Sequence, residues 1–144
     1  MSTTDPQTLS ATHRAFLEAR RIAVVATIGE DSSPHQATVW FRLDPDDRIM
    51  LNGRVERRWA KELRRTGRMS IAVLYPDGSS WLGLATELET VDDDPVRGLE
   101  GIMALHRLNH DGQAGPDAEA TYATHPRVTV RVRVTGVHDH LGSD

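Results

Sequence analysis

The sequence contains no cysteine. This absence excludes disulfide bonds, thiolate-bound metals and a cysteine nucleophile. Aromatic residues form only 5% of the 144 positions and hydrophobic residues 38%, both low values for a globular domain. A chain of this length forms one domain by the usual size range. We therefore predict a single domain over residues 1–144, and one hypothesis is that it completes its core by dimerising.

Long hydrophobic runs are also missing. No segment approaches the roughly 20 apolar residues of a membrane-spanning helix, and the N-terminus lacks the apolar core of a signal peptide. We therefore expect a cytoplasmic protein that does not act at a membrane. The formal net charge of -4 argues against a nucleic-acid partner.

Common catalytic motifs are absent as well. The chain has no Walker loop, no Gly-x-Gly-x-x-Gly and no serine in a Gly-x-Ser-x-Gly elbow. His106 and His110 lie four residues apart on a predicted helix, but no clear third ligand accompanies them, so no metal site is predicted. His35 is interpreted as a half-exposed histidine at the start of a strand. Because no residue stands out as a nucleophile or general base, the catalytic residues stay unknown and an enzyme of this kind would rely on a cofactor.

The pattern of apolar residues predicts a mostly β protein. Six strands are predicted, at 22–28, 35–43, 48–51, 69–75, 80–91 and 127–134. Predicted helices run from residue 8 or 10 to about 20, within 54–68 and from 95 to about 108, whereas 109–120 is predicted to be a loop. Residues 1–7 and 139–144 are predicted to be flexible tails. Short turns between consecutive strands favour antiparallel pairing, so we predict a six-stranded antiparallel β-barrel with flanking helices.

One segment, 54–68, holds seven of the 17 basic residues of an otherwise acidic chain. These residues are Arg54, Arg57, Arg58, Lys61, Arg64, Arg65 and Arg68. Positions three or four apart share a face of a helix, so a cationic stripe is predicted from Arg54, Arg57 or Arg58, Lys61, Arg64 or Arg65, and Arg68. Trp59 and Leu63 would face the core. A short cationic helix between two strands suits phosphate or another dense anion, but a solvated face of a surface helix explains the same pattern.

Three stretches at the start of the predicted barrel carry a family resemblance. The run Ile22-Ala23-Val24-Val25-Ala26-Thr27-Ile28-Gly29 is followed by Ser33-Pro34-His35 and then by Ala37-Thr38-Val39-Trp40-Phe41. A basic helix follows the third predicted strand, and Trp81-Leu82-Gly83-Leu84 lies on the fifth. In this order and spacing the residues resemble the pyridoxamine 5'-phosphate oxidase-like, FMN-binding split β-barrel family. More narrowly, the chain is similar to the actinobacterial branch that uses the deazaflavin coenzyme F-420 and includes biliverdin reductases.

The resemblance implies a homodimer that binds F-420 or FMN in clefts between its subunits. The strand Thr38-Val39-Trp40 would lie against the tricyclic ring of the cofactor. Trp81 would approach the site from the same subunit or from the partner. The residues that would hold the cofactor phosphate are Asn52, Arg54, Arg57, Arg58 and Lys61.

Two positions depart from the pattern of that family. With Leu63 as the anchor, Trp59 stands at the usual lysine place and Glu62 at the usual asparagine place. The resemblance therefore leaves two outcomes open. Either another cation, from Arg57, Arg58 or Lys61, takes over the lysine's role, or the cofactor is bound weakly or not at all.

The activity that the resemblance implies is F-420H2-dependent hydride transfer to an unsaturated small molecule, with the final proton supplied by water. FMN in the same site would leave oxidase activity open as well. The alternative is a non-catalytic protein that binds FMN, haem or a tetrapyrrole on the same barrel. Nucleic-acid binding through 54–68 ranks last, because Trp59 is the only aromatic residue there.

Overall fold

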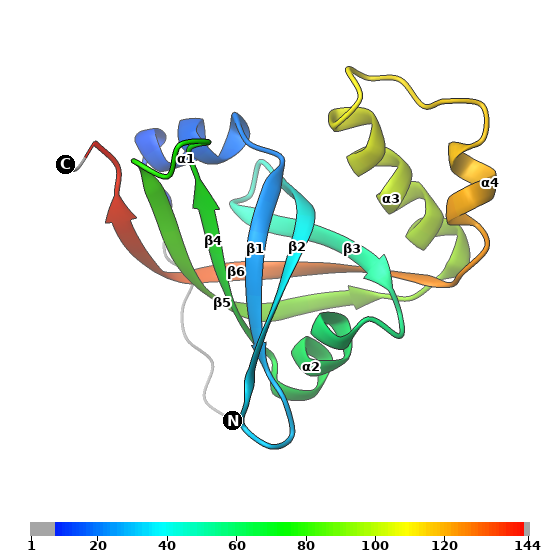
Figure 1. Cartoon of the computed structure of the whole chain (residues 1–144), viewed down its shortest axis with the longest axis horizontal. Coiled ribbons are helices and arrows are strands. Elements are labelled where there is room, and N and C mark those ends of the chain that lie inside the picture. The colour runs from blue at the N-terminus through cyan, green and yellow to red at the C-terminus, as the bar shows by residue number, and fades with distance from the viewer. Residues whose placement is uncertain (1–7, 143–144) are drawn as a thin grey trace.

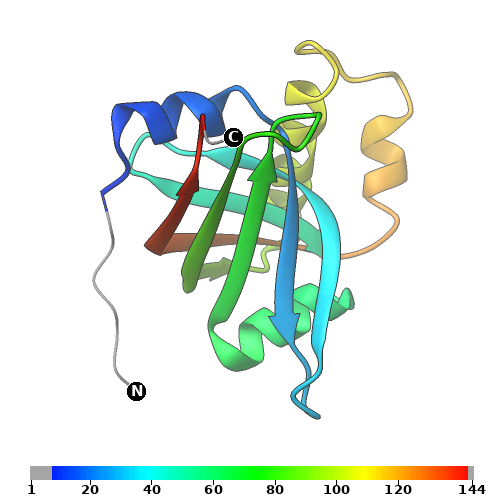
Figure 2. The same cartoon turned by 60° about the vertical axis from the view of Figure 1, so that its left-hand side comes forward.

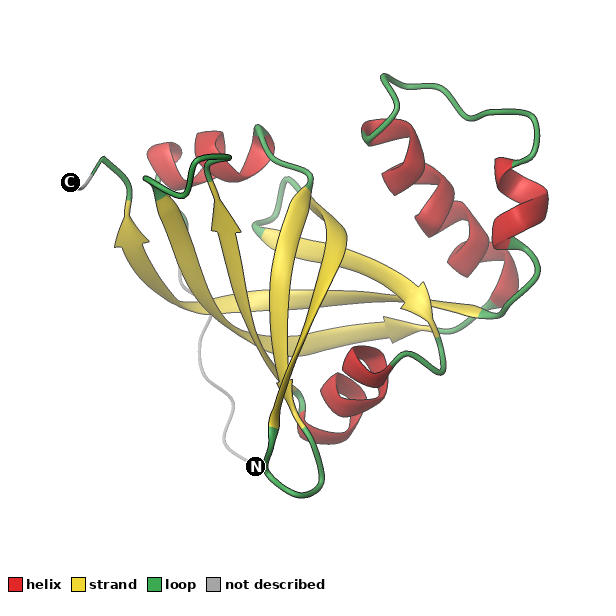
Figure 3. Cartoon of the chain, viewed as in Figure 1, coloured by secondary structure: helices red, strands yellow, loops and turns green. Residues whose placement is uncertain are grey.

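Figure 1 shows a β-barrel with helices at its ends and along one side. The structure is a computed structural model, and it describes residues 8–142. In chain order its elements are α1 (Ala11–Glu18), β1 (Ile22–Ile28), β2 (Pro34–Leu43), β3 (Arg48–Arg54), α2 (Arg58–Thr66), β4 (Arg68–Leu74), β5 (Trp81–Asp92), α3 (Pro95–Leu108), α4 (Ala118–Tyr122) and β6 (Arg127–His140). The predicted order of strands and helices is confirmed, with α4 as an addition that begins at the end of the predicted loop 109–120 (Figure 3).

The six strands close into one barrel in the order β1-β2-β3-β6-β5-β4. All six pairings are antiparallel, including the closing pair of β1 with β4. The predicted six-stranded antiparallel barrel is therefore confirmed. The pairing of β3 with β6 sets Asn52 opposite Thr129 and Arg54 opposite Arg127, which joins two segments far apart in the sequence.

Alternation along the strands builds the core. In β6, Val128, Val130 and Val132 are completely buried, as the strict alternation of valine predicts. The continuous apolar run at 22–28 is typical of a buried strand, but β1 alternates between buried and more exposed residues like the other strands. Its outward-facing Ile22 and Ile28 are 52% and 45% exposed, because only one face of a barrel strand points inside.

Two helices cover the ends of the barrel (Figure 2). Leu17 of α1 and Leu63 of α2 are fully buried in the hydrophobic core. Helix α2 is shorter than predicted and ends at Gly67, whose positive φ of 74° suits the C-terminal cap of a helix. Arg54 ends β3 and Arg57 is the extended N-cap of α2, so the predicted cationic stripe along one helix is wrong and the basic residues point to different sides.

Helix α3 packs closely on β3 and β6. A Cβ added to Gly98 would lie 2.6 Å from the backbone oxygen of Arg127, and one added to Gly101 would lie 2.5 Å from Thr129 Oγ1. These two glycines, three positions apart, let the helix approach the sheet. Asp94 caps the start of α3 by accepting hydrogen bonds from the backbone N–H groups of the first turn, as the acidic residues there predict.

The C-terminal strand is longer than the sequence indicated. Residues 139 and 140, assigned above to a flexible tail, belong to β6, where cross-strand stacking of Trp81 on His138 and His140 supports them. The predicted tails at 1–7 and 143–144 lie outside the described residues. Within residues 8–142, no helix is long and apolar enough to cross a membrane.

Candidate functional site

A cavity of about 410 Å³ opens between β2, β3, the start of α2 and the α3–α4 segment. We call it the Trp40 pocket; its lining residues are Ile22, Ala37, Thr38, Val39, Trp40, Asn52, Gly53, Arg57, Trp59, Ile102, Tyr122 and Arg127. Five of the nine residues predicted to bind a cofactor therefore meet here: Thr38, Val39, Trp40, Asn52 and Arg57. A site of this volume, apolar with a few convergent polar groups, has the character of a small-molecule pocket.

Positive charge collects at one side of the Trp40 pocket. Burial lowers the pKa of the Arg127 guanidinium; Tyr122 and Glu56 act in the opposite direction, and the positive charges of Arg54 and Arg57 lower it further. The side chain of Arg57 makes no hydrogen bond or ion pair with any residue in 8–142, and Arg54 reaches Glu56 only at 4.0 Å. A cluster with so little counter-charge favours an anion, and guanidinium groups suit phosphate best.

Asn52 holds this cluster in place. Its side chain is 6% exposed. The amide Nδ2 donates to the backbone oxygen of Gly98 at 2.8 Å and to Thr129 Oγ1 at 2.9 Å, and Oδ1 accepts from Nε of Arg127 at 2.8 Å. Because these bonds occupy the amide, Asn52 acts in the structure as the residue that positions Arg127.

Two imidazoles support Trp40 from outside the pocket lining. The rings of His106 on α3 and of His110, just after the end of that helix, meet Trp40 edge-on, with centroids 6.0 and 5.9 Å away. The two imidazoles stack on each other at 4.0 Å. The hydroxyl of Tyr122 lies 3.0 Å from Nδ1 of His106, which ties α4 to α3. Trp40 therefore packs against the α3–α4 segment through these two imidazoles.

Two of the predicted phosphate ligands lie elsewhere. Arg58 and Lys61 line a separate hollow of about 740 Å³, the His35 pocket, with Gly29, Glu30, Asp31, His35, Glu56, Glu62 and Arg65. The N-terminus of α2 divides the two sites, because successive side chains of a helix point in different directions. The expected single set of cations is therefore split, with Arg57 in one pocket and Arg58 and Lys61 in the other.

Glu62, which departs from the family pattern, has a structural partner. Its carboxylate accepts from Thr27 Oγ1 at 2.8 Å and bonds Nδ1 of His35 at 2.8 Å. Burial raises the pKa of Glu62, but these hydrogen bonds and the charges of His35 and Arg58 outweigh burial and lower it below its usual range. The pair joins α2 to the β1–β2 hairpin.

Trp59, the other departure, fills the space beside Gly53. It is 6% exposed, and a Cβ at Gly53 would lie 2.6 Å from its ring. Its side chain lines part of the Trp40 pocket and packs into the hydrophobic core. Trp59 therefore has a packing role at the place where the family pattern has a lysine.

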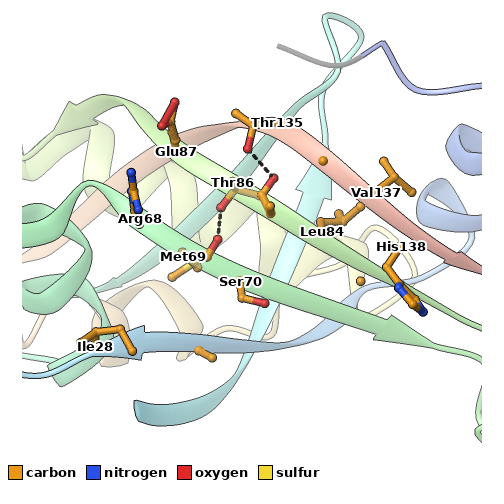
Figure 4. A pocket seen from close by; sticks show the side chains of 14 residues that line it. Ile28, Arg68, Met69, Ser70, Leu84, Thr86, Glu87, Thr135, Val137 and His138 are labelled. Atoms are coloured by element: carbon orange, nitrogen blue, oxygen red, sulfur yellow. Dashed lines mark hydrogen bonds between the residues drawn. The ribbon is translucent and has the colours of Figure 1, made fainter. Parts of the chain in front are cut away.

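Trp81 does not line the Trp40 pocket of its own chain. Its ring stacks on His138 with centroids 4.9 Å apart. His138 borders a groove of about 740 Å³ on the outside of β1, β4, β5 and β6, which we call the sheet groove. Figure 4 shows its floor, with Ser70 on β4 and Val137 on β6, the two strands that flank β5, and with Arg68 and Glu87 at one end.

Among residues 8–142, no three histidine, aspartate or glutamate side chains converge so as to hold a metal ion. His106 and His110 are stacked rather than aimed at a common point, and Nδ1 of His110 is bonded to the backbone oxygen of His106 at 2.8 Å.

With the barrel and its pocket in view, the comparisons with known proteins become informative. The model of the family described as pyridoxamine 5'-phosphate oxidase matches residues 9–140. The chain belongs to this family. The resemblance proposed from the opening strands is thereby confirmed.

The proteins that this chain resembles differ in their described functions. An F420H(2)-dependent biliverdin reductase of Mycobacterium tuberculosis is 32% identical over 113 residues, which cover 76% of this chain and 66% of that protein, just under two thirds. A solved structure described as an F420 reductase has a TM-score of 0.73 at 20% identity and covers 90% of this chain and 98% of its own. A haem storage protein from Vibrio cholerae has a TM-score of 0.67 at 13% identity, covering 92% and 95%. The two structural likenesses show a shared fold.

The residues present fit a flavin-type cofactor. The Trp40 pocket offers a flat indole and the β2 strand for a planar ring, and an under-compensated arginine cluster for a phosphate. Both kinds of group are needed for F-420 or FMN, and they lie in one cavity. The family resemblance predicted that Trp40 and Arg57 belong to one cofactor site, and both line this pocket.

Sequence reasoning missed Arg127 and Tyr122. The alternation along 127–134 predicts only that Arg127 faces away from the core, and no sequence pattern gives Tyr122 a role. Arg127 bonds Asn52 across 75 positions of sequence, and Tyr122 bonds His106 across 16. No local sequence pattern predicts contacts between residues so far apart. The one available indication was the predicted loop that connects α3 to the start of β6.

Proposed function

We propose that the Trp40 pocket binds F-420 or FMN and that the protein is an oxidoreductase, with F-420H2-dependent hydride transfer to an unsaturated small molecule as its reaction. The observation that carries this proposal is the convergence of Arg57 and Arg127 in the pocket that Trp40 lines, with the charge of Arg54 acting on Arg127 and little counter-charge nearby. The 32% identical biliverdin reductase supports F-420 as the first cofactor to test and biliverdin as the first acceptor.

Each part of the pocket has a task in this proposal. Arg57 and Arg127 hold the phosphate through charge-assisted hydrogen bonds, and Asn52 keeps Arg127 aimed at it. Thr38 and Trp40 orient the ring. The α3–α4 segment excludes water from the reacting face. The bound deazaflavin supplies a two-electron hydride when reduced.

Titration of the purified protein with F-420 and with FMN, followed by fluorescence, tests this assignment. Arg57→Ala and Arg127→Ala should each weaken binding about tenfold or more, because a hydrogen bond to a charged group contributes about 1.5–3 kcal/mol. Arg58→Ala and Lys61→Ala should have smaller effects, since they line the His35 pocket. Arg64→Ala removes the same charge from the exposed side of α2 and serves as the control. No binding of either cofactor by the wild-type protein would end the proposal.

The non-catalytic alternative is supported by the shared fold of a haem storage protein. Tight binding of FMN, haem or a tetrapyrrole, without reduction of biliverdin or other unsaturated acceptors by F-420H2, would favour this carrier function. Turnover would exclude it.

We also propose a homodimer, with a second copy covering the sheet groove. Small outward residues, such as Ser70, Ala85 and Gly136, leave the backbone open to close approach, and Ile28 beside them is 45% exposed. Such a dimer leaves open a contribution of Trp81 to the partner's site. Ala85→Arg should give a monomer in sedimentation equilibrium, and Ser79→Arg, in the exposed turn before β5, should not. A monomeric wild-type protein would refute the dimer.

A further inference from the structure

Tyr122, on the wall of the Trp40 pocket, is hydrogen-bonded to His106, which lies behind it. Tyr122 is the last residue of α4 and lines the cavity. Its hydroxyl lies 3.0 Å from Nδ1 of His106, and the two rings meet edge-on at 5.6 Å. His106 is held in turn by its stack on His110 and its edge contact with Trp40. The phenol therefore stands between a fixed imidazole and the space where a substrate would bind.

The state of His106 suits it to give a proton to the phenol oxygen. Burial lowers the pKa of His106, and the nearby His110 and Arg107 lower it further. The imidazole is therefore neutral at physiological pH and carries one proton. With that proton on Nδ1, His106 donates to the oxygen of Tyr122, and the hydroxyl hydrogen of the tyrosine is free to point into the pocket.

The other groups that line the pocket are poor proton donors. Thr38 offers an alcohol, Asn52 an amide whose hydrogens are already bonded, and Arg57 and Arg127 guanidinium groups that stay protonated. A phenol ordinarily ionises near pH 10, within reach of a general acid. The guanidinium of Arg127, 5.2 Å from the ring centroid of Tyr122, also stabilises the negative charge left on the oxygen once the proton has gone.

We propose that Tyr122 is the catalytic proton donor of the reaction and that His106 resupplies it; this rests on the proposed reductase function. One end of the substrate double bond receives hydride, two electrons and one hydrogen nucleus, from the reduced deazaflavin. The other end receives the phenol proton. The Tyr122 oxygen then takes the Nδ1 proton of His106, while Nε2 of the imidazole gains a proton from solvent. The substrate is reduced by two electrons and gains two hydrogens, and the tyrosine returns to its starting state. His106 regains its starting tautomer when Nδ1 takes a proton from solvent and Nε2 releases one. Tyr122 thus replaces water, the proton source expected from the sequence.

Tyr122→Phe tests the role, and Tyr75→Phe, at the only other tyrosine and on an exposed site, is the control. We expect Tyr122→Phe to bind F-420 as the wild-type protein does and to reduce the acceptor about a hundredfold more slowly or worse. His106→Asn, which keeps a donor amide, should lose less than His106→Leu. Nitrogen-15 NMR of the imidazoles gives a readout without cofactor: wild type should show His106 protonated on Nδ1, and the signal should change in Tyr122→Phe but not in Tyr75→Phe.

The outcomes separate the two proposals. Turnover by Tyr122→Phe at the wild-type rate, or identical His106 signals in both proteins, overturns the role of Tyr122 alone. Failure of the wild-type protein to bind F-420 or FMN, or binding without reduction of any acceptor, overturns the reductase function and this inference with it. Loss of F-420 binding in Tyr122→Phe, with unchanged thermal stability, would make Tyr122 a binding residue and also overturn its role as proton donor.

Discussion

Asn52 offers the sharpest test of how the site is built. The change is Asn52→Ala, which removes a buried amide that makes three hydrogen bonds. Each such bond contributes about 0.5–1.5 kcal/mol net, so together they account for roughly 1.5–4.5 kcal/mol of the free energy of unfolding. For a chain of this size, a loss of 1 kcal/mol lowers the unfolding midpoint by roughly 3–4 °C. We expect a fall of about 5–15 °C.

The same change should weaken cofactor binding. Arg127 loses the acceptor that aims its guanidinium, so the phosphate contact becomes less ordered even though the positive charge stays. Asn52→Asp separates the two effects, because it keeps an oxygen for Arg127 but adds a negative charge beside it and loses both Nδ2 bonds. We expect Asn52→Asp to bind the cofactor more weakly than Asn52→Ala does.

Thermal unfolding measures the midpoint, denaturant unfolding measures the free energy of unfolding, and fluorescence titration measures cofactor affinity. Asn109→Ala is the matched control: its amide makes one hydrogen bond, to the backbone oxygen of Leu105 at 2.9 Å, and Asn109 does not line the Trp40 pocket. It should cost no more than about 1.5 kcal/mol and leave binding unchanged. If Asn52→Ala unfolds within about 0.5 kcal/mol of the wild-type protein, the amide does not join β3, α3 and β6 as described here.

Three further changes test other contacts. Gly98→Ala should lower the free energy of unfolding by about 1–3 kcal/mol, because the new Cβ would lie 2.6 Å from the backbone oxygen of Arg127; Gly115→Ala, with no atom within 4 Å, is the control, and equal urea midpoints would contradict the close packing of α3. Burial raises the pKa of Glu62, but its hydrogen bonds outweigh burial and hold the pKa below the ordinary 4.5, so this stabilisation is full above pH 4.5 and is lost as pH falls through the lower folded pKa. Glu62→Gln should therefore flatten the fall of the melting temperature at acid pH, and an unchanged fall would argue against the Glu62–His35 pair. Burial holds the pKa of His106 below 6.5, so the free energy of unfolding is unaffected by this group above pH 6.5 and declines as pH falls through the lower folded pKa. His106→Asn should remove this decline. A decline that persists in the variant would belong to another group.

Strong local patterns made most of the barrel predictable. The alternation of valine with arginine in β6 and the short turns between strands specify inward and outward faces without reference to the rest of the chain. The acidic cap of α3 and the buried side of α2 follow from local rules too. Predictions were wrong where local signals were weak or absent: the five-residue helix α4, the end of β6, and a helix start that divides one basic segment between two pockets.

The sequence by itself determined that the chain forms an antiparallel barrel and that cations gather after the third strand, because both depend on neighbours a few positions apart. Only the tertiary structure decided which cations share a cavity. Arg127 joins Arg57 because β3 and β6 pair along their length, and Arg58 is separated from Arg57 by the turn of a helix. The pairing of Glu62 with His35 and of Tyr122 with His106 likewise exists only after distant elements have packed. The pairing of the strands and the packing of the helices, rather than any sequence motif, therefore decide which residues line the site.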